Sequence, residues 1–268
     1  MSGDKAGKTY WEQCWEHAPS PSVVDPRAKG LNHYVNRKLH EFFLDTFSGM
    51  ATEGKTLLEI GCANSAWLPY FSKEFGFRVC GVDYTAQGCQ QERQILTNEG
   101  VKGEVVCCDF FCPPQSMRGA FDVVVSFGVV EHFEDTAGCL RAFSEFLKPG
   151  GLLFTNIPNL AGLIGSIQKL VNRPVFDIHV PLDNRALAAA HQASLDVQSC
   201  RYFLFANWNV LNVETWERNI SYHVFVRLRS WISKGCWVLE CFVPGIRPNR
   251  LTSPYIICVA RKPCASLW

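Results

Sequence analysis

The amino-acid sequence predicts an α/β fold in which a doubly wound, mostly parallel sheet carries helices on both faces. In residues 56–85 an apolar run ends in Gly61, a helical segment follows, and a second apolar run ends in Asp83. Residues 121–127, FDVVVSF, form another continuous apolar run, as expected of a central parallel strand that is buried on both faces. Because the chain has 268 residues, we expect residues 1–268 to form one domain.

The turn after the first of these strands has the features of a nucleoside-binding site. Gly61 and Ala63 let the backbone approach a ligand closely, because neither side chain fills the space above the turn. Asn64 or Ser65 can cap the next helix, which leaves free amide groups pointing at the bound molecule. Asp83 ends the second strand about 20 residues farther on, where a carboxylate can accept hydrogen bonds from both hydroxyls of a ribose. The unit therefore predicts an adenosine-type ligand.

Two glycine motifs compete for this turn. Gly61, Ala63 and Ala66 match the dinucleotide fingerprint weakly, since two of its three glycines are missing. Glu59, Gly61, Ala63 and Ser65 follow the pattern acidic, x, Gly, x, Gly, x, Gly, with small residues in place of the last two glycines. In this motif the chain resembles the class I S-adenosylmethionine-dependent methyltransferases. The strand that ends at Asp109, the SFG and VEHFED segments, and KPGG extend the resemblance over roughly residues 56–158.

The resemblance implies a Rossmann-like sheet of seven strands, of which the last is antiparallel, and S-adenosylmethionine as the cofactor. It implies that Asp109 accepts from the adenine amino group and that Phe110 packs on the ring; alternatively, Asp109 only caps a turn. It also implies a lid segment at residues 1–50, a cofactor-binding core at 51–158, and acceptor-site insertions at about 159–195 and 207–252. The predicted cofactor-binding residues are Tyr34, Glu59, Gly61, Cys62, Ala63, Asn64, Asp83, Tyr84, Asp109, Phe110, Phe127 and Gly128.

The remaining elements follow from the spacing of apolar residues. We expect helices over residues 31–47, 87–98, 140–147, 160–171, 181–193 and within 216–234. We expect further strands over residues 103–109, 197–206 and 254–261, and one that ends near residue 157. The helix at 160–171 has one apolar face, which predicts a roof over the acceptor pocket, core packing or contact with a membrane surface.

Two histidines are the candidates for proton transfer. His132 follows the strand at residues 121–127 and has an ordinary pKa near 6.5, so it can accept a proton from an acceptor, or it only orients the loop. His179 lies in a predicted loop and is the second candidate, both as a base and as a substrate contact. The other predicted substrate residues are Tyr10, Trp11, Asn156 and Asn159, with the aromatic side chains closing the pocket or packing on the sheet.

The composition of the chain argues against several classes of binding partner. A net charge of +1 gives no electrostatic footprint for duplex nucleic acid, and the interrupted apolar region at residues 152–171 predicts no membrane-spanning helix. The first residues are polar, so we expect no signal peptide and a cytoplasmic protein with its 13 cysteines reduced. Cys107, Cys108 and Cys112 lack metal-site spacing, and we predict no metal. The oligomeric state stays open.

The sequence therefore predicts transfer of a methyl group from S-adenosylmethionine to nitrogen, oxygen or sulfur of a small, hydrophobic or aromatic metabolite. One alternative is an NAD-dependent oxidoreductase, which would keep Asp83 on the ribose but would prefer the complete set of glycines. The other is a catalytically silent protein that has the fold of a methyltransferase and only binds.

Overall fold

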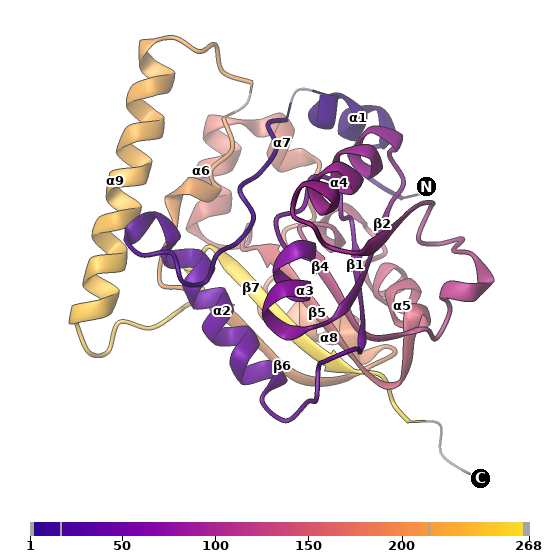
Figure 1. The fold of residues 1–268 in the computed structure, drawn as a ribbon. Coiled ribbons are helices and arrows are strands. Elements are labelled where there is room, and N and C mark those ends of the chain that lie inside the picture. Colours follow the sequence, from indigo (N-terminus) through magenta and orange to yellow (C-terminus); the bar gives the residue numbers. More distant parts are fainter. Residues whose placement is uncertain (1–2, 17, 214, 265–268) are drawn as a thin grey trace.

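The computed structural model describes residues 3–16, 18–213 and 215–264, and a seven-stranded sheet is its centre (Figure 1). The strand order is β3-β2-β1-β4-β5-β7-β6. Strands β1 to β5 pair in parallel, and β7 is antiparallel to both of its neighbours, β5 and β6. This confirms the predicted fold class. The bounds are β1 Thr56–Ile60, β2 Arg78–Asp83, β3 Gly103–Cys107, β4 Phe121–Phe127, β5 Leu147–Pro158, β6 Asp196–Phe203 and β7 Tyr255–Arg261.

Helices cover both faces of this sheet because the side chains of successive strand residues point to opposite faces. Leu57 packs with Phe43 and Phe71 of α2 and α3, whereas Leu58 packs with Phe143 of α5 and with α8. The α-helices are α1 Lys8–Glu16, α2 Tyr34–Phe47, α3 Leu68–Phe75, α4 Ala86–Asn98, α5 Thr136–Phe146, α6 Leu163–Val171, α7 Arg173–Asp177, α8 Asn184–Gln192 and α9 Ile220–Phe242. Short 3-10 turns are η1 Leu31–His33, η2 Gln115–Met117, η3 Val130–His132 and η4 Trp208–Val210.

The sheet places three strand ends at one edge. Ile60 of β1 pairs with Val82 of β2 on one side and with Ser126 of β4 on the other. From β1 the chain adds β2 and β3 on one side and then β4 and β5 on the other, so the strand order reverses between β1 and β4. In open α/β sheets, ligands bind at such a reversal point. The turns after β1, β2 and β4 therefore form the floor of a site.

Several element bounds differ from the prediction. Helix α5 begins at Thr136, four residues early, because the Asp135 carboxylate accepts from the Gly138 amide and caps it. Strand β3 ends at Cys107 rather than Asp109. Helix α1 and helix α7 occupy segments for which no helix was predicted.

The helix that was predicted at residues 160–171 begins at Leu163 as α6. Its residue Ile164 packs against Leu160 and Leu211, which agrees with the core-packing interpretation, while Leu170 is exposed. Within the residues that the structure describes, no helix combines the length and apolarity that a membrane crossing requires.

Candidate active site

The backbone of the turn after β1 forms the floor of the candidate site. Gly61 has a φ of 77°, and a Cβ atom built there would lie 2.4 Å from Cγ2 of Val129. The Gly61 amide donates to the carbonyl oxygen of Val82 at 2.8 Å, which ties the turn to β2. Only glycine fits both the backbone conformation and the close neighbour. Val129 thus occupies the space above Gly61 that the sequence-based prediction left to a ligand, while Gly61 itself lines the cavity described below.

Asp83 lies at the end of β2 and faces this turn. Its Oδ1 accepts from the amide and the hydroxyl of Thr85 at 2.8 Å and 2.6 Å, whereas the Ala63 amide is 3.4 Å from Oδ2. Burial raises the pKa of Asp83, and the Thr85 hydrogen bonds oppose that rise. The weak contact of Oδ2 leaves that oxygen with capacity to accept from a ligand hydroxyl.

Two buried carboxylates hold Ser65 beneath the turn. The Ser65 hydroxyl donates to Glu59 at 2.7–2.9 Å, and the Ser65 amide donates to Oε2 of Glu92 at 2.8 Å. Burial and, after it, the neighbouring Glu92 raise the pKa of Glu59 well above its usual range. The predicted cofactor residue Glu59 thus also fixes the turn from inside.

Replacing Glu92 with glutamine should remove a pH-dependent penalty on stability. Burial raises the pKa of Glu92 to about 8, so the folded state retains a proton that the unfolded state loses near pH 4.5. Stability of the native chain should then fall as pH rises from about 4.5 to about 8. We expect Glu92→Gln to match the native chain at pH 5 and to be more stable at pH 8 by roughly 3–4 kcal/mol.

Urea unfolding at both pH values measures this difference. The matched control is Glu104→Gln, because Glu104 is exposed and its replacement should change neither value. If the native chain were instead to become more stable than Glu92→Gln between pH 5 and pH 8, the raised pKa of Glu92 would be contradicted.

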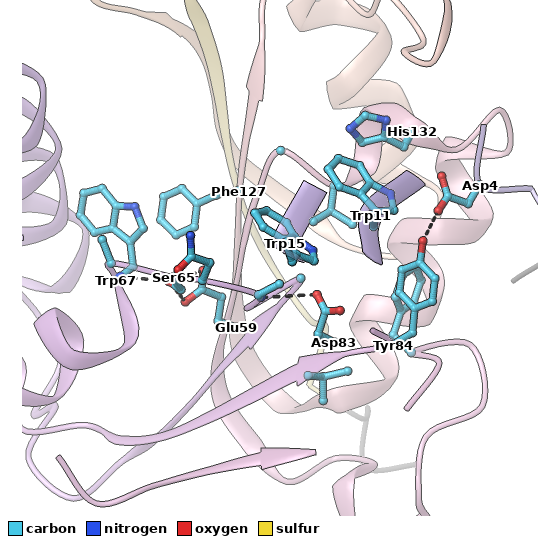
Figure 2. A pocket seen from close by; sticks show the side chains of 18 of the residues that line it. Asp4, Trp11, Trp15, Glu59, Ser65, Trp67, Asp83, Tyr84, Phe127 and His132 are labelled. Carbon is cyan, nitrogen blue, oxygen red and sulfur yellow. Dashed lines mark hydrogen bonds between the residues drawn. The ribbon is translucent and has the colours of Figure 1, made fainter. Parts of the chain in front are cut away.

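A cavity of about 350 Å³ opens above the turn, and Figure 2 shows the side chains around it. The amino-terminal segment covers it, because Trp11 and Trp15 of α1 stack at 5.8 Å and both line the cavity. The Tyr84 hydroxyl donates to the Asp4 carboxylate at 2.5 Å and joins this segment to β2. The lining residues that were predicted from sequence are Trp11, Glu59, Gly61, Ala63, Asn64, Asp83, Tyr84, Phe110, Phe127, Gly128 and His132.

His132 lies on the wall of the cavity with a defined tautomer. Its Nδ1 is 2.9 Å from the carbonyl oxygen of Ile178, and because a carbonyl only accepts, Nδ1 carries the proton and Nε2 the lone pair. The ring meets Trp11 edge to face at 5.0 Å. Burial, followed by the nearby His179, lowers the pKa of His132 to about 4. The imidazole is therefore neutral and able to accept a proton at pH 7.

His179 lies behind His132, with 4.3 Å between the ring centres, and does not line the cavity. Its Nδ1 donates to the Val175 carbonyl at 2.6 Å, and burial lowers its pKa. The carboxyl group of Glu131 lies near both rings, since one potential ligand atom from each of the three residues lies within 4.8 Å of the others. No metal is predicted from the sequence, and among the described residues Glu131, His132 and His179 are the group whose potential ligand atoms lie close enough to hold an ion.

Four predicted site residues have other positions. Tyr34 is buried against Trp237, with ring centres 5.4 Å apart, and lies outside the cavity. The Cys62 side chain is buried in the core beneath the turn. Asn159 is fully buried and its amide donates to two backbone carbonyls, which gives it a structural role. Tyr10 packs edge to face on Trp11 at 5.0 Å and does not line the cavity.

Two further predictions fall near the cavity rather than in it. Asp109 does not line it, and its Oδ1 accepts from the Phe111 amide at 2.9 Å, as in the alternative interpretation of a turn cap. Asn156 lines a neighbouring cavity of about 310 Å³, which shares Trp67, Phe127 and Gly128 with the first one.

Sequence reasoning missed several lining residues. Trp67 stacks on Phe127 with ring centres 5.0 Å apart, and Trp15 and Asp4 come from the amino-terminal segment. A signal for Trp15 was present, because it follows Trp11 by one helical turn and shares its face. The lining residues that were not among the predicted site residues are Asp4, Trp15, Pro21, Ser65, Ala66, Trp67, Val82, Cys108, Val129 and Phe133, of which Ser65 and Ala66 belong to the glycine motifs noted in the sequence.

Comparison with known proteins decides the family. A family model described as a methyltransferase domain matches residues 31–210. The chain belongs to the S-adenosylmethionine-dependent methyltransferase family. This confirms the predicted family and its cofactor, S-adenosylmethionine.

The relatives of the chain within this family include O-methyltransferases. It is 27% identical over 154 residues to the ubiquinone biosynthesis O-methyltransferase of Sodalis glossinidius, covering 54% of this chain and 61% of that protein. It is 30% identical over 175 residues to the protein of the same name from Pseudomonas paraeruginosa, covering 62% of this chain and 74% of that one. The chain thus spans somewhat more than half of the first of these curated relatives.

Solved structures share the fold at low identity. A putative sarcosine dimethylglycine methyltransferase from Galdieria sulphuraria has a TM-score of 0.62 at 10% identity, covering 96% of this chain and 98% of that one. The [4+2]-cyclase SpnF also has a TM-score of 0.62, at 14% identity over 99% and 98% of the two chains. The second protein is named for an activity other than methyl transfer, so the fold does not by itself settle the reaction.

The cavity fits the family cofactor. Gly61 lines the cavity with backbone alone, and Asp83 presents the weakly bonded Oδ2 beside it. Phe110 and Phe127 add apolar aromatic surface to the wall. A nucleoside with a small zwitterionic tail matches this combination of acidic side chains, bare backbone and aromatic rings.

Proposed function

We propose that the protein is a methyltransferase that acts on a hydroxyl group of a small aromatic or apolar metabolite. The observation that carries this proposal is the cavity itself, in which the Asp83 carboxylate, the bare turn at Gly61 and the neutral His132 face one space. The name O-methyltransferase of the relatives supports oxygen over nitrogen or sulfur as the acceptor. The apolar wall supports an aromatic acceptor.

Asp83, Gly61 and Ala63 would hold the cofactor, with Asp83 accepting from ribose hydroxyls and the turn lying against the methionine part. S-adenosylmethionine supplies a methyl group that is electrophilic because it is bonded to a sulfonium sulfur. Trp11 and Trp15 cover the cavity and exclude water from it. The acceptor hydroxyl would give its proton to Nε2 of His132 while its oxygen takes the methyl group, and the carbon–sulfur bond of the cofactor would break to leave S-adenosylhomocysteine.

The neighbouring cavity of about 310 Å³, which His132 does not line, offers room for the part of the acceptor that lies beyond its hydroxyl group. It meets the first cavity at Trp67, Phe127 and Gly128, and the rings of Trp67 and Phe127 lie nearly parallel, at 8°. Oδ1 of Asn156 has no hydrogen-bond partner among the described residues, so it is available to a polar group of the acceptor. Asn156 thereby keeps its predicted role as a substrate contact within this proposal.

Calorimetric titration tests the proposal against its two rivals. We expect S-adenosylhomocysteine to bind and NAD not to bind. Incubation with methyl-labelled S-adenosylmethionine and a panel of catechols, phenols, amines and thiols should then label hydroxylated aromatics. Binding of NAD alone would favour the oxidoreductase, and binding of S-adenosylhomocysteine without transfer to any compound would favour a silent binding protein.

A further inference from the structure

Helix α9 turns an apolar face toward solvent. It runs along the outside of the molecule in Figure 1, within the connection between β6 and β7. At 100° per residue, its exposed apolar side chains fall within an arc of about 120°, and the polar side chain inside that arc is Ser221. The exposed apolar residues are Ile220, Val224, Leu228, Trp231, Ile232, Val238, Leu239 and Phe242. Trp231 and Phe242 are 74% and 80% exposed, respectively.

The opposite face of α9 is fixed to the body of the protein. The Trp237 indole donates to the Ala206 carbonyl at 2.8 Å and its ring stacks on Tyr34. The buried Ser233 hydroxyl accepts from the Trp208 amide at 2.8 Å. These contacts fix the rotation of α9 about its own axis. The apolar stripe therefore faces solvent because the opposite face of the helix is packed against the protein.

The charge around the stripe is positive. Residues 207–252 contain six basic and three acidic residues, although the whole chain has a net charge of only +1, so the rest of the chain is net negative. Arg227 and Lys234 lie beside the stripe on the helical projection, about 20–40° from its edge. The acidic residue of the helix, Glu240, is on the inner face, where it accepts from the Phe205 amide.

Large exposed apolar surfaces mark contacts with proteins or with membranes. A two-fold dimer through α9 would set the stripe against itself and bring Arg227 and Lys234 of both copies to one rim, with like charges opposed. An anionic lipid surface instead pairs with these cations while the stripe enters the acyl boundary. A 23-residue helix is about 35 Å long, so the whole stripe can lie in the plane of the interface.

We propose that the outer face of α9 docks the protein on an anionic lipid bilayer, with Trp231 and Phe242 inserted at the interface and Arg227 and Lys234 at the phosphate level. The connection that holds α9 leaves β6 and enters β7 at Phe203 and Tyr255, which pair at the same edge of the sheet as Pro158 at the end of β5. The docking helix therefore extends from the edge of the sheet that also holds the active-site turns. The inference does not depend on the proposed reaction.

Vesicle sedimentation of the purified full chain tests the proposal. We expect binding to vesicles of equimolar phosphatidylcholine and phosphatidylglycerol, weaker binding to phosphatidylcholine alone, and loss of that difference at high salt. Trp231→Glu/Phe242→Glu should reduce the partition coefficient at least about tenfold. Arg227→Ser/Lys234→Ser should abolish most of the preference for phosphatidylglycerol. The matched control is Leu44→Glu, an exposed leucine of α2, which should bind as the native chain does.

Circular dichroism and titration with S-adenosylhomocysteine check that each variant is folded. A native chain that stays in the supernatant with both vesicle types overturns the proposal, as does a Trp231→Glu/Phe242→Glu variant that binds like the native chain. If light scattering shows a dimer that this variant dissociates, and no vesicles are bound, the stripe belongs to a second copy instead.

Discussion

Replacing Asp83 with alanine is expected to weaken the binding of S-adenosylhomocysteine about a hundredfold. The loss follows from removing a carboxylate that can accept from both ribose hydroxyls, since hydrogen bonds to a charged group contribute about 1.5–3 kcal/mol each. Asp83→Asn retains an oxygen for the Thr85 amide and should lose about tenfold. Calorimetric titration of the two variants and the native chain measures both losses.

Asp109→Ala is the matched comparison, because Asp109 also follows a strand but does not line the cavity. We expect its affinity for S-adenosylhomocysteine to stay near that of the native chain. An equal loss in Asp109→Ala would instead support the adenine contact predicted from sequence, with the loop after β3 closing on the ligand. Unchanged affinity in Asp83→Ala, with an unchanged thermal midpoint, would remove Asp83 from the cofactor site.

The fold was predictable because its signals are local. Each parallel strand is a short apolar run that ends in a small or polar residue, as at Gly61 and Asp83, and the order of such runs fixes a doubly wound sheet. The first and last residues of an element were less predictable where a capping side chain determined them. The Asp135 cap extends α5 backward by one turn; aspartate is a preferred N-cap residue, but helical periodicity alone did not place the start of the helix there.

The floor of the site was predictable for the same reason. Glu59, Gly61, Ala63 and Asn64 are close in sequence, and Asp83 is joined to them by a single strand pairing. Tyr34 shows the limit of this reasoning. Its position at the start of a helix is compatible with covering the cavity, yet its ring stacks on a tryptophan about 200 residues away in the chain, which no local pattern reveals.

The contact between His132 and His179 is likewise one that no local sequence pattern reveals. The two residues are separated by helices α5 to α7 and by β5, and they meet because the Ile178 carbonyl accepts from Nδ1 of His132. From the sequence, both histidines are candidates for the same role, proton transfer. The structure separates the roles, because His132 lines the cavity and His179 lies behind it.

Replacing His132 with glutamine is expected to lower turnover about a hundredfold with little change in S-adenosylhomocysteine affinity. A glutamine amide can still donate to the Ile178 carbonyl, but it has no lone pair basic enough to take the acceptor proton. Base catalysis contributes roughly 10²–10⁴-fold, and a base with a pKa of about 4 falls at the lower end because its driving force is small. Single-turnover kinetics with labelled cofactor measure the effect.

The pH dependence separates this role from a structural one. The lowered pKa means that Nε2 of His132 is unprotonated from pH 8 down to about 5, so turnover should be flat there and should fall only near pH 4. His191 is the matched control, since it is equally buried, its pKa is also lowered to about 4, and it lies outside the cavity on Thr155. His191→Gln should alter stability while keeping turnover per folded molecule. If His132→Gln turned over as fast as the native chain, the acceptor would lose its proton to another group. If turnover and cofactor affinity fell together, His132 would shape the cavity rather than accept the proton.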